Sequence, residues 1–104
     1  MTTFDDRERA AEAKFAHDEE TEFRIIARRH KLLGLWAAEM LGKSGDDAQA
    51  YALEVVKSDF EEAGHDDVVR KVASDLGARV TQDEIRTKMA ALMAEARQQI
   101  QNEV

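Results

Sequence analysis

Large apolar side chains are sparse at the start of this chain and dense from Phe23 onward. Among the first 22 residues they are Met1, Phe4 and Phe15, set between alanines and charged residues. Neither Gly nor Pro occurs in the first 33 residues, so the backbone favours helix throughout. Packing supplies most of the stability of helices in proteins, and this helix has little to bury. The pattern predicts a helix-competent, mobile N-terminal arm that becomes ordered on a partner.

Apolar residues at three- and four-residue spacing predict four helices in the rest of the chain. The first includes Phe23–Leu41 and ends at Gly42. The second begins at a Ser44 cap and runs to Gly64. The third and fourth are expected over about 66–76, ended by Gly77, and from a capping box at residues 81–84 onward. Short connections between these helices favour a compact four-helix bundle, so the predicted fold is all-α.

Each predicted helix has a stripe of residues expected to be buried. Trp36 is expected in the core, with Gly34 allowing a close helix approach. Met89 and Met93 are interpreted as core rather than as a recognition surface. The predicted stripes of the second, third and fourth helices are Ala48, Tyr51, Ala52, Val55, Val56 and Phe60; Val68, Val69, Val72, Ala73 and Leu76; and Ile85, Met89, Leu92, Met93, Ala96 and Ile100.

The boundary between arm and bundle is expected near residue 19, giving an arm over 1–19 and a bundle over 20–104. Residues 17–22 have no apolar side chain, and Asp18 suits a helix cap, which favours a joint there in the free protein. However, Phe4, Phe15 and Ile26 are spaced eleven residues apart and keep one helical phase. A single helix from Asp5 to Leu41 is therefore compatible with a bound state. The sequence permits both forms.

Composition and charge narrow the class of protein. The chain has 104 residues, a net charge of −7 and no Cys. A negative charge disfavours binding to nucleic acid and to anionic lipid. No apolar run approaches the roughly 20 residues of a membrane span, and the acidic start is unlike a signal peptide. The chain is expected to be cytoplasmic and soluble, without membrane insertion or disulfides.

Candidate chemistry is limited. The basic residues of one stretch could contact phosphate or an acidic partner surface, or they could pair with the acid-rich second helix; they are Arg24, Arg28, Arg29, His30 and Lys31. Among them, Arg28, Arg29 and Lys31 are the candidate contacts for an anion or a nucleotide. His65-Asp66, taken with another His and Asp83, superficially suggests a metal-dependent phosphohydrolase, but an Asp after a turn is ordinarily a helix cap. No P-loop, zinc motif or Ser-His-Asp arrangement is present. We expect no enzyme activity, no cofactor and no metal.

The chain contains, in order and without large gaps, the strings FDDRERA, EAKFAHDEE, ARRHKLLGLWAAEMLG, EVVKSDFEEAG, DDVVRKV and EIRTKM. These strings resemble the zeta-type inhibitor subunit of the F-type ATP synthase of alphaproteobacteria, over essentially the whole chain. His30 and Met40 depart from the Asn and Lys frequent in that family, and neither lies in the arm.

The resemblance implies a four-helix bundle with a mobile N-terminal segment that inhibits ATP hydrolysis. In the family this segment enters the interface of the catalytic α and β subunits near the rotor γ subunit and blocks rotation. The partner would thus be the catalytic head of the ATP synthase, met at the cytoplasmic face of the inner membrane. The residues implied for partner binding in the arm are Phe4, Asp5, Arg7, Glu8, Arg9, Ala11, Lys14 and Phe15.

Two other functions remain open at the level of the sequence. One is a small helical sensor that binds a nucleotide or anion weakly through Arg28, Arg29 and Lys31. The other is a small all-helical enzyme of the mutase type that would need a buried cluster of converging Arg side chains.

Overall fold

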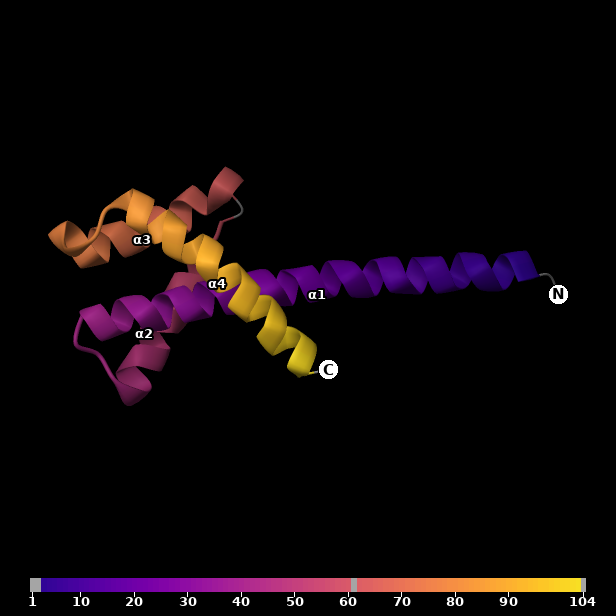
Figure 1. Ribbon diagram of the computed structural model, residues 1–104, viewed down its shortest axis with the longest axis horizontal. Helices are drawn as coiled ribbons and strands as arrows, with labels where there is room; N and C mark the ends of the chain where they lie inside the picture. The colour runs from indigo at the N-terminus through magenta and orange to yellow at the C-terminus, as the bar shows by residue number, and fades with distance from the viewer. Residues whose placement is uncertain (1–2, 61, 104) are drawn as a thin grey trace.

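The molecule is built from four α-helices joined by short connections (Figure 1). The structure, a computed structural model, describes residues 3–60 and 62–103, and side chains from residue 19 onward. The helices are α1 (Thr3–Met40), α2 (Gly45–Lys57), α3 (Asp66–Leu76) and α4 (Gln82–Asn102). Two 3-10 turns, η1 (Ala63–His65) and η2 (Gly77–Arg79), flank α3. The predicted all-α, four-helix fold is confirmed.

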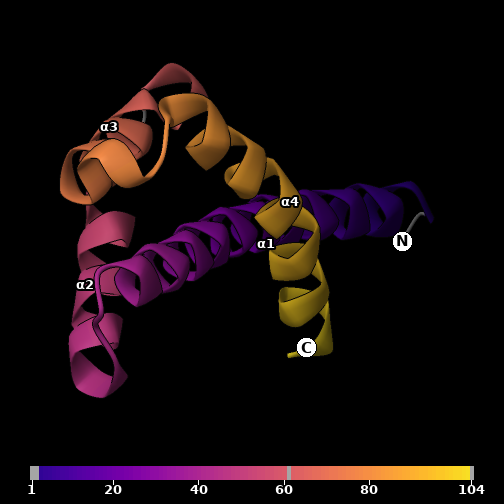
Figure 2. The same ribbon diagram turned by 60° about the vertical axis from the view of Figure 1, so that its left-hand side comes forward.

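Helix α1 determines the shape of the molecule. Its 38 residues span roughly 57 Å at 1.5 Å per residue, which accounts for most of the 64 Å longest dimension. Only the C-terminal part of α1 lies among the other helices, where it packs against α2 and α4 (Figures 1 and 2). The N-terminal part extends beyond them as a continuous helix, without the joint expected near Asp18.

The core lies between the C-terminal half of α1 and the other three helices. Its larger cluster joins Leu33, Ala37 and Ala38 of α1 to buried residues of α2, α3 and α4. A smaller cluster, where α4 crosses α1, contains Ile25, Ala96 and Ile100. Nearly all of the predicted stripe positions are buried or half-buried, as is Trp36, which packs against the larger cluster.

Three of the predicted helix ends are confirmed by their hydrogen bonds or backbone angles. Gly42 adopts a φ of +76° after α1, and the Lys43 N–H bonds to the Ala38 carbonyl at 2.9 Å. This is the pattern of a glycine-terminated helix. The Thr81 hydroxyl accepts the Glu84 N–H at 3.1 Å at the start of α4. Gly77, with a φ of +60°, follows the last residue of α3.

The predicted end of the second helix is wrong. Helix α2 stops at Lys57, well before Gly64, and the Phe60 side chain is 76% exposed rather than buried. The carboxylate of Asp67, itself buried in α3, accepts the backbone N–H of Phe60 and draws the chain away from the helix. A contact across seven residues therefore overrides the local apolar spacing. Ser44 lies at the cap position of α2, but its side chain makes no cap hydrogen bond.

Candidate functional site

The N-terminal part of α1 carries the residues predicted to bind a partner. Its backbone is helical from Thr3, in phase with the rest of α1. The side chains predicted for partner contact lie outside the residues whose side chains the structure describes; they are Phe4, Asp5, Arg7, Glu8, Arg9, Ala11, Lys14 and Phe15. The structure therefore gives the direction of this segment, and its chemistry remains a prediction from sequence.

Ion pairs tie the root of this segment to the C-terminal end of α4. Arg97 donates to the Glu22 carboxylate at 2.7 Å, and this hydrogen bond lowers the pKa of Glu22. Six residues further along α1, Arg28 pairs with Glu103 at 2.6 Å and donates to Gln99. Arg24 reaches the same Glu103 carboxylate at 3.6 Å. These contacts connect α1 to α4 close to the point where α1 leaves the bundle. The part of α1 that precedes its first core residue, Ile25, is its free length.

The three basic residues proposed as an anion site have different surroundings. Arg28 is engaged by α4, whereas Lys31 is exposed to solvent. Arg29 is buried, with 9% of its surface exposed. Burial lowers the pKa of Arg29, and the charge of Asp59 only partly offsets this effect. Arg24 and Arg28 pair with α4 rather than with the acid-rich second helix, so the predicted intramolecular partners are wrong for these two residues.

Beside the root of the free segment lies a hollow of about 330 Å³ between α1 and the connection from α2 to α3. Its apolar wall contains Phe23, Ile26 and Ala27 of α1 and Val56 of α2. Phe23 is 71% exposed at its rim. An apolar wall with an exposed aromatic residue is common at protein interfaces.

The polar wall of the hollow contains His30, Asp59, Glu62 and His65. His30 Nε2 lies 3.0 Å from Asp59 Oδ2, and His65 Nδ1 lies 3.3 Å from the same oxygen. The His30 ring is only 1% exposed. Burial and the nearby Arg29 charge lower the pKa of His30, while the hydrogen bond to the Asp59 carboxylate opposes them. The net direction keeps the His30 ring neutral at neutral pH.

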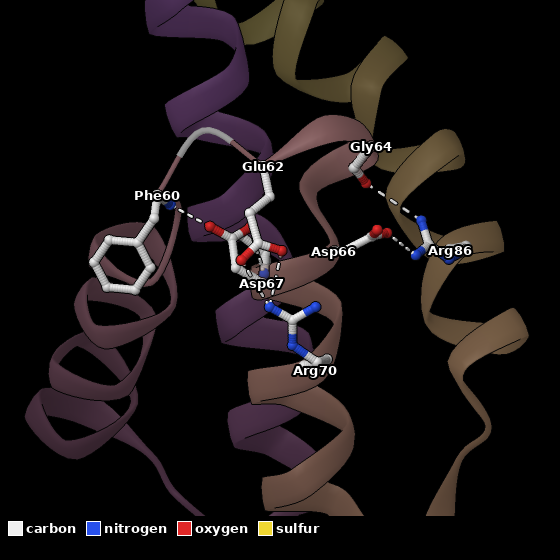
Figure 3. A network of polar contacts seen from close by, with 8 residues as sticks. Phe60, Glu62, Gly64, Asp66, Asp67, Arg70 and Arg86 are labelled. Carbon is white, nitrogen blue, oxygen red and sulfur yellow. Dashed lines mark hydrogen bonds and ion pairs between the residues drawn. The ribbon is translucent and has the colours of Figure 1, made fainter.

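A network of polar contacts positions the connection that carries Asp59 and His65 (Figure 3). Arg86 of α4 bonds to the Gly64 carbonyl at 3.2 Å and to the Asp66 carboxylate. Glu62 pairs with Arg70 at 2.8 Å. His65 adopts a φ of +56°, in the left-handed region that L-residues rarely occupy. The network thus holds a short, sharply turned segment against α1.

Sequence reasoning missed this grouping of His30, Asp59 and His65. The sequence places His65 beside Asp66 and favours Asp66 as a helix cap, whereas the Asp66 carboxylate pairs with Arg86. The N-cap of α3 is His65 itself. Asp59 lies within the acid-rich segment predicted to form the second helix. The early end of α2 brings it to His30, and no local pattern signals that end.

Among the described residues, no helix combines the length and apolar character needed to cross a membrane. The buried polar or charged residues of the described part of the chain are Arg29, His30 and Asp67. Arg29 is the one buried arginine among the described residues, so the converging Arg cluster required by a mutase-type enzyme is not found there.

Comparisons with known proteins identify the family. A family model described as ATPase inhibitor subunit zeta matches residues 1–99. A solved structure, a solution NMR structure, is 58% identical, with a TM-score of 0.74. The similarity covers 80% of this chain and 98% of the solved one. No curated protein matches. Members of the matched family are inhibitors of an ATPase and not enzymes. The chain belongs to the ATPase inhibitor subunit zeta family.

Proposed function

We propose that this chain inhibits ATP hydrolysis by the F-type ATP synthase through its N-terminal arm, residues 1–19. The arm enters the interface between the catalytic α and β subunits and blocks rotation of the γ subunit. Residues 20–104 form the body that docks on the enzyme head, at the cytoplasmic face of the inner membrane. Family membership supports an ATPase as partner, and the resemblance of the arm strings supports the mechanism.

The observation that carries this proposal is the free length of α1. The side chains buried in the core begin at Ile25, whereas Glu19, Glu20 and Phe23 are exposed. The helix nevertheless runs on to Thr3, beyond the other three helices (Figure 1). A helical segment that extends beyond the other helices is suited to pack against a partner protein.

Continuity with α1 also makes binding by a short arm energetically feasible. Starting a new helix is unfavourable because several residues are ordered before the first hydrogen bond forms. An arm that extends an existing helix avoids this nucleation step and only adds turns. The free energy lost in ordering the arm on its partner is then smaller than for an isolated peptide of the same sequence.

The test is a truncation that starts at Glu20 and therefore keeps the Glu22–Arg97 pair. We expect the truncated chain to retain the circular dichroism and unfolding midpoint of the body and to lose inhibition of the purified ATPase. A full-length chain with residues 1–19 in scrambled order is the matched control for length and charge. Inhibition by the truncated chain equal to that of the full chain would refute the proposal.

Point variants test whether an arm side chain makes the contact. Phe15→Ala is expected to weaken inhibition by about tenfold or more, the loss typical of a buried aromatic anchor at an interface. Leu53→Ala, which alters an exposed apolar residue of α2, is the matched control and should inhibit like the unchanged chain. Equal inhibition by both variants would remove Phe15 from the proposed contact.

Binding of a nucleotide or anion by Arg28, Arg29 and Lys31 remains a prediction with less support. Arg28 already has a carboxylate partner in Glu103. Titration of the chain with ATP, followed by amide chemical shifts, tests it directly. Localised shifts at these residues would favour a sensor function, and their absence at millimolar ATP would exclude it.

A further inference from the structure

Two imidazoles and one carboxylate meet at the polar wall of the hollow, and they come from different parts of the chain. His30 lies in α1, Asp59 follows the end of α2, and His65 ends η1. One candidate ligand atom from each lies within 4.8 Å of the other two. The tertiary structure therefore brings together three side chains that have the donor atoms of a metal site.

The chemistry of the three donors selects a class of ion. Neutral imidazole nitrogen is a preferred ligand of zinc and similar transition metals, and a carboxylate oxygen completes many such sites. Calcium and magnesium instead favour sites built from oxygen ligands. We propose that His30, Asp59 and His65 bind a transition-metal dication of the zinc class. The chain's function as an ATPase inhibitor is not a premise of this proposal.

The distances suit tetrahedral coordination. Metal–ligand bonds of about 2.0–2.2 Å place tetrahedral ligands roughly 3.3–3.5 Å apart. The Asp59 oxygen lies 3.0 Å from the His30 nitrogen and 3.3 Å from the His65 nitrogen, close to that spacing. The candidate ligand atoms of the two rings lie within 4.8 Å of each other, so coordination requires the rings to move closer together.

The hydrogen bonding of the rings leaves room for an ion. His65 Nδ1 lies 3.3 Å from the Asp59 oxygen and makes no hydrogen bond to a described residue. His30 Nε2 is hydrogen-bonded to Asp59, so an ion would replace that hydrogen bond, and the proton of the His30 ring would then lie on Nδ1, which is buried without a partner among the described residues. Buried polar atoms ordinarily have partners. An ion shared by the three side chains would give the lone pair of His65 a partner.

The charges around the cluster act in both directions. The charge of the buried Arg29 acts on the neighbouring His30 and disfavours a bound cation. Glu62 also lines the hollow and adds negative charge, although it is paired with Arg70. Three protein ligands leave a fourth position for water.

A metal at this position would link α1 to the connection between α2 and α3. Such an ion binds the folded chain and not the unfolded chain, so it would raise the stability of the body. It would fix the connection drawn in Figure 3 close to Phe23, where the free length of α1 begins. The proposed role is structural.

The experiment is a titration of the metal-free full-length chain with Co²⁺, monitored by visible absorption, and with Zn²⁺ in competition. We expect one ion per chain, the strong absorption of tetrahedral cobalt, and a higher thermal midpoint with zinc. Asp59→Asn and His65→Asn should weaken binding by at least about tenfold, since loss of even second-sphere partners often costs that much. His17→Asn, which alters the one histidine outside the cluster, is the matched control and should bind like the unchanged chain.

A second measurement avoids substitutions in a buried cluster. In the unchanged chain labelled with ¹⁵N-histidine, zinc should shift the ring signals of His30 and His65 and leave those of His17 in place. No binding at millimolar zinc would overturn the proposal. So would equally tight binding by Asp59→Asn and His65→Asn, or ring shifts confined to His17.

Discussion

Gly34 shows how a single residue sets the distance between α1 and α2. A Cβ atom added to Gly34 would lie 2.6 Å from the Ala52 Cα and 3.2 Å from the Val55 Cβ. The first of these neighbours is backbone, which cannot rotate away. The absence of a side chain at Gly34 therefore permits the close approach that the sequence analysis expected there.

Gly34→Ala is accordingly expected to destabilise the chain by about 1–3 kcal/mol, the usual cost of overpacking. Helix propensity alone would have produced a gain of about 1 kcal/mol from the same change. Unfolding in urea measures the difference. Ala91→Gly, at an exposed position of α4, is the control that reports propensity without a clash. A Gly34→Ala chain as stable as the unchanged one would contradict the close approach.

Tyr51 illustrates a buried polar group whose partner is supplied by another helix. Its hydroxyl donates to Asp75 of α3 at 2.8 Å, and Lys71 bonds to the same carboxylate oxygen at 2.8 Å. Burial, followed by the hydrogen bond to Asp75, raises the pKa of Tyr51 well above its ordinary value. The phenol therefore remains protonated in the folded chain when it would ionise in the unfolded one.

This difference predicts a loss of stability at alkaline pH. Above about pH 10 the unfolded chain releases the phenol proton and the folded chain keeps it, so the free energy of unfolding falls as pH rises. In Tyr51→Phe the decline should be shallower, and what remains includes the contribution of Lys71, whose pKa is also raised by Asp75. Tyr51 is the only tyrosine, so phenolate absorbance reports it alone. Ionisation of the folded chain near pH 10 would contradict this prediction.

At the scale of the helices, the ends that depend on local chemistry were predictable. Gly42, Gly77 and Thr81 mark helix ends in the sequence and in the structure. The end of α2 was not, because it depends on Asp67 binding the backbone of Phe60. The hollow follows from that end, and so does the meeting of His30 with Asp59 across 29 residues. Periodicity describes one helix at a time and carries no information on such contacts.

The N-cap residues Thr81 of α4 and Ser44 of α2 allow a direct comparison between these two helices. Thr81→Ala removes the hydroxyl that accepts the Glu84 N–H and is expected to cost about 1 kcal/mol of stability. Ser44→Ala should cost distinctly less, because the Ser44 side chain makes no cap hydrogen bond. Thermal or urea unfolding of the two variants provides the measurement. Equal losses would show that the cap bond of Thr81 contributes little.

At the scale of the whole molecule, α1 is the element that the other helices share. Ile25 packs with Ala96 and Ile100 of α4, whereas Leu33, Ala37 and Ala38 belong to the larger core. The smaller cluster is the last part of the core before the free length of α1. It therefore determines where the body ends and the arm begins in terms of packing.

Ile100→Ala is expected to destabilise the body by about 2–5 kcal/mol, as for other fully buried large-to-small changes. Leu53→Ala, at a position 51% exposed, should change stability by less than about 0.5 kcal/mol. Amide exchange should also become faster in α1 around Ile25, because this residue loses a packing partner. Similar stability losses for both variants would contradict the assignment of Ile100 to the core.

Because α1 is one unbroken helix, the rotation of the arm about the helix axis is fixed relative to the body. Each residue of an α-helix turns the chain by about 100° and advances it by about 1.5 Å. One residue inserted between Glu20 and Thr21 would therefore swing every arm side chain about a quarter turn around the axis without altering the sequence of either part. The face that the arm presents is thus set by the angle at which the four-helix body sits. When the arm is bound and helical, the position of the body on the enzyme therefore determines which side of the arm meets the partner.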